Sequence, residues 1–251
     1  MQARYFAESA YLGKAYCGWQ KQPGQISVQS VIEGALQTIL GQETEITGCG
    51  RTDSGVHAKQ YFFHFDFPGS FPDGFLRRIN KFLPPDIAIR RIIPVADDAH
   101  ARFHATHRAY EYHLTMHKDP FSQETAYFYP YALRPDFKKL QEAATLLLDY
   151  QEFFPFCKTN TDVKTMECNL VRSEWKQSGD EQELVFHIAA NRFLRGMVRL
   201  IVGMCVNVAT SKLDLESVKI ALDKQIRLEK SWSVPPEGLF LTDIRYPFIL
   251  L

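Results

Sequence analysis

The chain has 251 residues, of which 45% are hydrophobic and 19 are Phe, so it can bury a core as one large domain or two smaller ones. Basic and acidic residues balance at 29 each, which excludes a uniformly basic nucleic-acid-binding domain and restricts any basic surface to a local patch. The five cysteines are odd in number and include no CxxC pair, which argues against a disulfide framework or a zinc ribbon and favours a reducing cytoplasm.

The first part of the chain alternates between strand-like and helix-like patterns. Apolar residues recur at helical spacing over 27–41, where Ser27 can cap the start and Gly41 can end the helix. A second helix, with several basic residues, is expected at 71–83 and is closed by two prolines. Alternation predicts strands at 5–12, 43–47, 59–67, 87–95 and 109–116.

A proline- and tyrosine-rich connection, roughly 118–135, is expected to join an N-terminal half, 1–118, to a C-terminal half, 119–251. Beyond it, periodicity predicts helices at 136–150, 191–210 and 215–224, and strands at 168–175, 183–190 and 238–244. The predicted class is α+β, with two similar halves that each hold a mostly antiparallel sheet and helices on one face. No signal peptide is expected in the N-terminal stretch, and the apolar stretch 200–209 is too short to span a bilayer.

The stretch GCGRTDSG at 48–55 places Arg51 and Asp53 in a glycine-rich bend before a strand. Residues two apart in an extended segment share a face, and an arginine keeps a neighbouring carboxylate ionised. An ionised carboxylate can act as a nucleophile or general base, and the guanidinium suits a phosphate or a nucleobase. Such pairs in turns are more often structural, and spacing alone favours that interpretation.

Further motifs favour the functional interpretation of this pair. The stretch CGRTDSGVHA resembles the GRTDxGVHA signature of the TruA family of tRNA pseudouridine synthases. The resemblance extends, in the order of the family and over nearly the whole chain, to YCGWQKQ, SVQSVIEGAL, FLPPDIA, HARF, the YEY of Tyr110 and Tyr112, MVRLIVG and EGLFLTDIRYP. Two positions depart from the family pattern. Ala109 replaces a second arginine before Tyr110, and Leu200 replaces an asparagine after MVR.

The resemblance implies an isomerase that converts uridine to pseudouridine at positions 38, 39 and 40 of the tRNA anticodon stem-loop, without a metal or organic cofactor. It implies that Asp53 is the catalytic carboxylate, which attacks the uridine or takes a proton during base rotation. Arg51 would help to extrude the nucleotide, Tyr110 would pack on the base, and Arg199 would pair with Asp53. Flipping a uridine out of its stack costs a few kcal/mol, and stacking of the base on an aromatic ring offsets about 1–3 kcal/mol of this cost.

The resemblance also implies RNA contacts in the segment of His100, Ala101, Arg102 and Phe103, a central RNA-binding cleft between the halves, and a cytoplasmic homodimer that binds tRNA. The apolar residues of 193–208 could serve the dimer interface or the core equally well. The spacing i, i+3 and i+7 would place Arg192, Arg195 and Arg199 on one face of a helix. The sequence does not decide between attack at the sugar and attack at the base, nor which uridines are modified.

Three alternatives remain open. His100, His104 and His107 have helical spacing and could hold zinc in a hydrolase, although the segment runs into a strand. A non-catalytic RNA-binding module would need no aspartate at position 53. A thiol nucleophile at Cys49 is the third alternative, although buried cysteines are most often apolar fillers.

Overall fold

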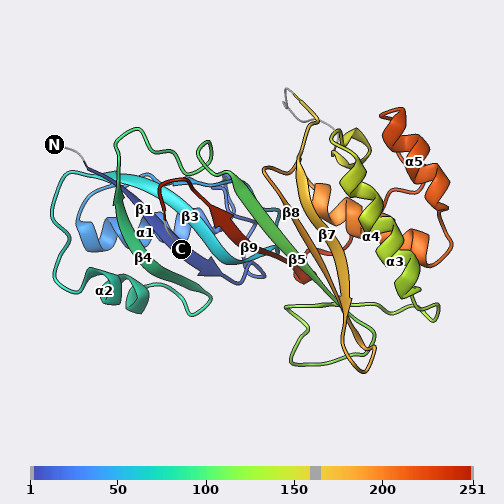
Figure 1. Ribbon diagram of the computed structural model, residues 1–251. Helices are drawn as coiled ribbons and strands as arrows, with labels where there is room; N and C mark the ends of the chain where they lie inside the picture. The colour runs from blue at the N-terminus through green and yellow to red at the C-terminus, as the bar shows by residue number, and fades with distance from the viewer. Residues whose placement is uncertain (1–2, 159–164, 250–251) are drawn as a thin grey trace. The chain divides into compact units, whose positions relative to one another are not determined.

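The computed structural model describes residues 3–158 and 165–249. The chain divides into two compact units, Met1–Thr106 with Phe240–Leu251 and His107–Leu239 (Figure 1). Both units combine a mostly antiparallel set of strands with helices, which confirms the predicted α+β class. The boundary expected at 118/119 lies inside the second unit, just after its first strand, and the similarity of two halves stays a prediction.

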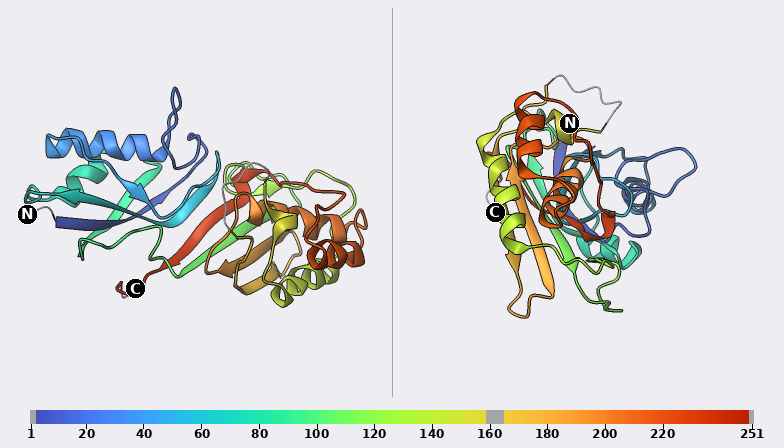
Figure 2. Two further views of the ribbon diagram at one scale, coloured as in Figure 1. Left: turned by 90° about the horizontal axis from the view of Figure 1, so that it is seen from above. Right: turned by 90° about the vertical axis from the view of Figure 1, so that its right-hand side faces the viewer.

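In the first unit, strand β1 pairs antiparallel with both β3 and β4, β2 pairs antiparallel with β3, and β9 pairs parallel with β3. Two helices, α1 and α2, lie on one face of these strands (Figure 2). The elements are β1 (Ala3–Tyr11), α1 (Val28–Leu40), β2 (Thr47–Gly48), β3 (His57–Phe67), α2 (Phe75–Phe82), β4 (Ile87–Val95) and β9 (Leu239–Arg245).

Alternation along β1 and β3 builds two apolar layers, because neighbouring side chains point to opposite faces. The pair Tyr5 and Phe65 faces the same side as the Phe71 ring, at 4.8 Å between the Tyr5 and Phe71 centroids. Phe6, on the opposite face, packs edge-on against Tyr246 at 5.1 Å. The sheet of the first unit is therefore covered on both faces, by helices on one and by the C-terminal segment on the other.

In the second unit, β8 lies between β5 and β7 in antiparallel pairing, and β6 pairs parallel with β5. Buried side chains of the strands, such as Trp175 and Phe186, share one face with α3 and α4, and the Ser173 hydroxyl donates to the Ala144 carbonyl of α3 at 2.7 Å. The elements are β5 (His107–Thr115), β6 (Tyr127–Phe128), α3 (Phe137–Leu146), η1 (Leu147–Asp149), η2 (Phe154–Phe156), β7 (Leu170–Gln177), β8 (Glu183–Ala190), α4 (Met197–Ala209), α5 (Leu215–Asp223) and η3 (Pro236–Gly238).

Two predicted helix starts are wrong, and a glycine with positive φ explains each. The helix expected from 71 begins at Phe75, because Gly74 has φ 65° and Phe71 packs in the aromatic layer. The helix expected from 191 begins at Met197, after Gly196 with φ 73°. By contrast, Ser27 caps α1 and Gly41 ends it in the left-handed conformation, both as predicted. In the described part of the chain, no helix has the length and apolar character needed to cross a bilayer.

Candidate active site

The loop that carries Asp53 connects β2 to β3 in the first unit, and we call residues 49–56 the Asp53 loop. Asp53 is half-buried, whereas Arg51 is exposed. The loop closes on itself because the Val56 N–H donates to the Asp53 carbonyl at 3.2 Å, and Gly55 supports the turn with φ 80°. The carboxylate is thus fixed by a tight turn while the guanidinium stays open to solvent.

The segment Tyr16–Trp19 holds the Asp53 loop through main-chain contacts. Ser54 Oγ and the Gly55 N–H both donate to the Tyr16 carbonyl, at 3.2 and 3.3 Å. The Trp19 N–H donates to Thr52 Oγ1 at 3.1 Å. Gly18 has φ 80°, and a Cβ at this position would lie 2.2 Å from the Thr52 carbonyl oxygen. Only glycine permits so close an approach, which explains the YCGWQ stretch in physical terms.

A buried aromatic pair supports the loop from below. The rings of Trp19 and Tyr61 stack at 4.0 Å, and the Tyr61 hydroxyl donates to the Gly50 carbonyl. Burial raises the pKa of Tyr61 well above its usual value, so the hydroxyl stays a hydrogen-bond donor. Cys49 is only 1% exposed in this packing. Burial to this degree argues against a role for its thiol as a nucleophile on an external substrate.

His57, the first residue of β3, is a supporting residue that the sequence analysis missed. It is fully buried, its Nδ1 accepts a hydrogen bond from the Gly13 N–H at 2.9 Å, and its ring stacks on Phe240 at 4.6 Å. A Cβ on Gly13 would lie 1.9 Å from the Val56 carbonyl oxygen. The end of the Asp53 loop is therefore fixed against the turn after β1. The signal was present in the GVHAK stretch, but one histidine in a strand has no periodicity that reveals such a role.

The predicted RNA-contact segment of His100, Ala101, Arg102 and Phe103 forms a turn on the first unit. Ala101 is fully buried, its N–H donates to His64 Nδ1 at 3.2 Å and its carbonyl accepts from the Tyr246 hydroxyl at 2.6 Å. Phe103 is 71% exposed, and the Arg102 guanidinium lies 5.6 Å from its ring centroid. Arg102 and Phe103 are therefore accessible to RNA, whereas Ala101 anchors the turn.

The helical spacing of His100, His104 and His107 is not realised, because 101–104 is a turn and His107 begins β5. His100 Nδ1 accepts from the Arg102 N–H at 3.1 Å, and His104 Nδ1 accepts from the His100 N–H at 3.2 Å. A search of 3–158 and 165–249 finds no group of three or more His, Cys, Asp or Glu side chains suited to a metal ion. The zinc-hydrolase alternative thus has no geometric support in the part described.

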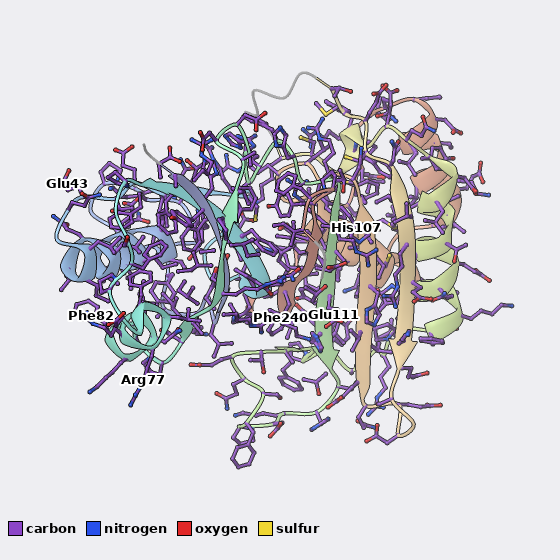
Figure 3. The ribbon with its side chains drawn as sticks, turned by 60° about the vertical axis from the view of Figure 1, so that its left-hand side comes forward. Glu43, Arg77, Phe82, His107, Glu111 and Phe240 are labelled. Carbon is purple, nitrogen blue, oxygen red and sulfur yellow. The ribbon has the colours of Figure 1, made fainter. Side chains whose placement is uncertain are left out.

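Tyr110 and Arg199 lie in the second unit. Tyr110 is on β5, the strand on which Figure 3 labels His107 and Glu111, and its ring contacts that of Phe193 edge-on at 5.2 Å. Arg199, in the first turn of α4, is half-buried, and its Nε donates to the Val234 carbonyl at 2.6 Å.

The predicted arginine stripe is wrong, because Arg192 and Arg195 precede α4 and do not continue its helical face. Arg51 and Asp53 belong to the first unit, and Tyr110 and Arg199 to the second. Their meeting in one cleft stays a prediction.

Comparisons with known proteins give the class. A family model described as tRNA pseudouridine synthase matches residues 144–247. A protein of Parabacteroides distasonis is 44% identical over 97% of this chain and 96% of its own length, and one of Bacteroides fragilis is 43% identical over the same shares. The chain therefore belongs to the tRNA pseudouridine synthase family, and it is an isomerase by class.

Within that family, the relatives from Parabacteroides distasonis and Bacteroides fragilis both carry the name tRNA pseudouridine synthase A. A relative from Nitrosomonas eutropha with the same name is 38% identical over 94% of this chain and 85% of its own length. Among solved structures, an unknown protein from Galdieria sulphuraria aligns with a TM-score of 0.23 at 10% identity, over 85% of this chain and 94% of that chain, which is too weak to carry an argument.

Proposed function

We propose that this enzyme converts uridine to pseudouridine in the anticodon stem-loop of tRNA, at positions 38, 39 and 40, with Asp53 as its catalytic carboxylate. The observation that carries the proposal is the Asp53 loop itself. A half-buried carboxylate follows an exposed arginine, and a dedicated segment, Tyr16–Trp19, holds the loop through its main chain. Nearly the whole chain matches relatives named tRNA pseudouridine synthase A.

The reaction moves a glycosidic bond within one nucleotide. The bond between N1 of the uracil and C1′ of the ribose breaks, the base rotates, and a bond forms between C5 and C1′. The proton on C5 leaves and a proton is gained at N1, so substrate and product have the same atoms and no oxidant or reductant is consumed. Asp53 can attack the nucleotide transiently or accept the proton from C5, since both roles need an ionised carboxylate.

The other predicted residues would handle the extruded nucleotide. Arg51 is exposed beside Asp53, so its guanidinium can contact the phosphates around a flipped base. Tyr110 offers an aromatic face for the base, and Arg199 supplies a positive charge that would pair with Asp53. Exposed Arg102 and Phe103 provide a cation and a ring for neighbouring RNA.

The proposal includes a homodimer and a cytoplasmic location, both of which the family resemblance implies. The neutral composition, with 29 basic and 29 acidic residues, means that attraction to RNA depends on local basic groups. Ala109 stands where the family commonly has a second arginine, so RNA contact at this position is either weaker or supplied by basic residues elsewhere.

The test is the replacement Asp53→Asn, which keeps the shape of the side chain and removes its charge. Wild-type protein is incubated with a tRNA transcript that has a uridine at position 39, and pseudouridine is quantified by mass spectrometry of the digested RNA. We expect conversion by the wild type without added cofactor, and a rate lower by about 10²- to 10⁴-fold or more in the variant. The variant should bind tRNA with an affinity close to that of the wild type.

The same experiment separates the proposal from a non-catalytic RNA-binding module. A binding module would bind the transcript and convert none of it, with or without the aspartate. Equal conversion by both proteins would show that another residue is catalytic.

A further inference from the structure

The second unit has a pocket of about 230 Å³ that the proposed chemistry does not use. Tyr131, Asn207, Lys212 and Trp232 line it, and we call it the Tyr131 pocket. It lies along the same helix as Arg199. Asn207 follows Arg199 by two helical turns on α4, a rise of about 12 Å at 1.5 Å per residue.

The segment 230–234 runs beside this face of α4 and links the pocket to Arg199. The Asn207 side chain donates to the Lys230 carbonyl at 3.2 Å, and at the other end Arg199 donates to the Val234 carbonyl at 2.6 Å. Between them, a Cβ on Gly203 would lie 1.8 Å from the Trp232 carbonyl oxygen. This contact fixes Trp232 at the wall of the pocket.

Aromatic rings surround the pocket. The Tyr131 ring is 51% exposed and contacts Tyr129 at 4.9 Å, and the Trp232 ring contacts Tyr127 at 6.1 Å. Beside the Tyr131 and Trp232 rings, Asn207 and Lys212 supply the polar groups of the lining. This is the composition of a site for a flat ligand with polar edges.

Lysines give the pocket a positive rim. Lys212 Nζ lies 5.1 Å from the Tyr131 ring centroid, Lys230 Nζ donates to the Lys212 carbonyl at 3.0 Å, and Lys139 Nζ donates to Ser211 Oγ at 2.9 Å. A cationic ligand would be repelled by the Lys212 ammonium, which lies close to the Tyr131 ring. A ligand that is aromatic and anionic fits both the rings and the lysines.

Two acidic residues in this part of the second unit, Asp136 and Asp214, are engaged in helix caps. Asp136 accepts from the Lys139 N–H at 3.1 Å at the start of α3, and Asp214 accepts from the Ser217 N–H at 2.7 Å at the start of α5. Carboxylates at helix N-termini are offset by the helix dipole.

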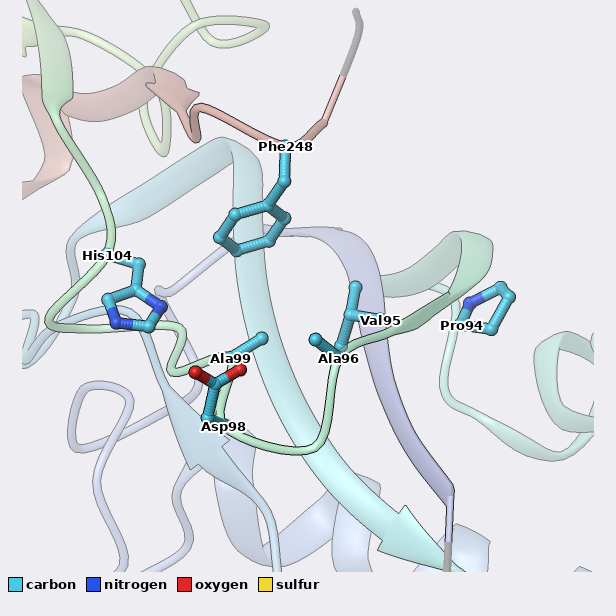
Figure 4. Close-up of a pocket in the computed structure, with 7 residues that line it drawn as sticks. All are labelled: Pro94, Val95, Ala96, Asp98, Ala99, His104 and Phe248. Atoms are coloured by element: carbon cyan, nitrogen blue, oxygen red, sulfur yellow. The ribbon is translucent and has the colours of Figure 1, made fainter.

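A larger pocket on the first unit serves as a contrast. It measures about 430 Å³, and Asp98, His104 and Phe248 are among the residues that line it (Figure 4). Among the residues that the structure describes, no lysine or arginine lines this pocket, and a carboxylate disfavours a phosphate.

We propose that the Tyr131 pocket binds one unstacked nucleotide of the tRNA substrate, with its base against Tyr131 and Trp232 and its phosphate on Lys212. The inference rests on the proposed function, which supplies tRNA as the ligand. It adds a second nucleotide-binding position, separate from the Asp53 loop, through which the enzyme holds the RNA.

The test measures binding of a fluorescently labelled tRNA transcript by anisotropy to the full chain. The variants are Tyr131→Ala and Lys212→Gln. Loss of one stacking interaction should weaken tRNA binding by about 5- to 150-fold in Kd in the first variant. The second should lower the slope of log Kd against log salt by about 0.7 to 0.9, as expected for one lost phosphate contact.

Two matched controls are available. Phe121→Ala removes a ring that is 98% exposed in the same 118–135 connection, and Lys176→Gln removes an exposed lysine of β7. Neither residue lines the pocket, so both variants should bind tRNA and form pseudouridine like the wild type. Thermal unfolding of all four variants checks that the fold is intact.

The outcomes separate this inference from the proposed function. Wild-type affinity and salt slope in both pocket variants would overturn the inference, whatever the activity. An equal loss of affinity in the Phe121 control would also overturn it, since a general surface effect would then explain the result. If the wild type binds tRNA but forms no pseudouridine, the proposed function fails, while the effect of the pocket on Kd is still measurable.

Discussion

His64 lies under the turn that carries Arg102 and Phe103, and its environment opposes protonation. The ring is 6% exposed, and its Nδ1 accepts the Ala101 N–H. Burial, followed by the charges of Arg4 and His100, lowers the pKa of His64 to about 4, against a weaker opposing effect of Asp66. Because Nδ1 can accept this hydrogen bond only when the ring is neutral, the stability of the first unit depends on pH through His64.

The free energy of unfolding is therefore expected to fall already at a pH above the range in which carboxylates titrate. The folded-state pKa is lower than the unfolded value of 6.5, so the unfolded chain binds the extra proton first. The contribution to stability is complete above pH 6.5 and declines as the pH falls through 4, by about 3 kcal/mol in total. Chemical denaturation between pH 7 and pH 4.5 should show this decline, and His64→Gln should flatten it. Equal slopes in both proteins would contradict the assignment to His64.

At the residue scale, the sequence indicated the proposed catalytic residues better than the residues that support their loop. Asp53 and Arg51 stand out because glycines flank a short charged pair. Tyr61 and His57 do not stand out, because one buried tyrosine or histidine in a strand has the same pattern as ordinary core. Their roles depend on carbonyl and amide groups far away in the chain, such as the Gly13 N–H, and spacing along one strand carries no information on these partners.

Among the elements, α4 is the most completely buried. Every residue from Met197 to Ala209 except Arg199 is buried, so this helix belongs to the core of the second unit. Its close approach to the segment 230–234 depends on Gly203. The helix was expected from its apolar pattern, but its start was not, because Gly196 turns the chain just before it. Strand pairs such as parallel β3 and β9 were also beyond prediction, since they join residues nearly two hundred positions apart.

Two glycine-to-alanine substitutions in helices should have opposite effects. In α4, Gly203→Ala places a methyl group against the Trp232 carbonyl, which cannot move without displacing the segment that contacts Arg199. We expect a loss of about 1–3 kcal/mol in stability. In α1, Gly34→Ala adds a methyl group with no heavy atom within 4 Å and should stabilise by about 0.5–1 kcal/mol through helix propensity. Chemical denaturation of both variants measures this; a neutral Gly203→Ala would contradict the close contact.

For the whole molecule, the burial of α4 limits where a second copy can bind. The apolar residues of 193–208 were equally compatible with an interface and with a core, and those on α4 are covered within the single chain. A homodimer must therefore use another surface. Sedimentation velocity at micromolar concentration is expected to give twice the 28.9 kDa of one chain. A single species at 28.9 kDa would show that the active form needs no partner copy.

The main-chain contacts that hold the Asp53 loop come from a segment that leads directly into an exposed stretch of chain. Tyr16 and Trp19 fix the loop largely through backbone atoms, whereas 20–26, which follow directly, are exposed and close in a bridge between Gln22 and Gln25. Substitutions of exposed side chains in this tip are therefore expected to leave the backbone around Asp53 in place, because the contacts that hold the loop come from the preceding segment.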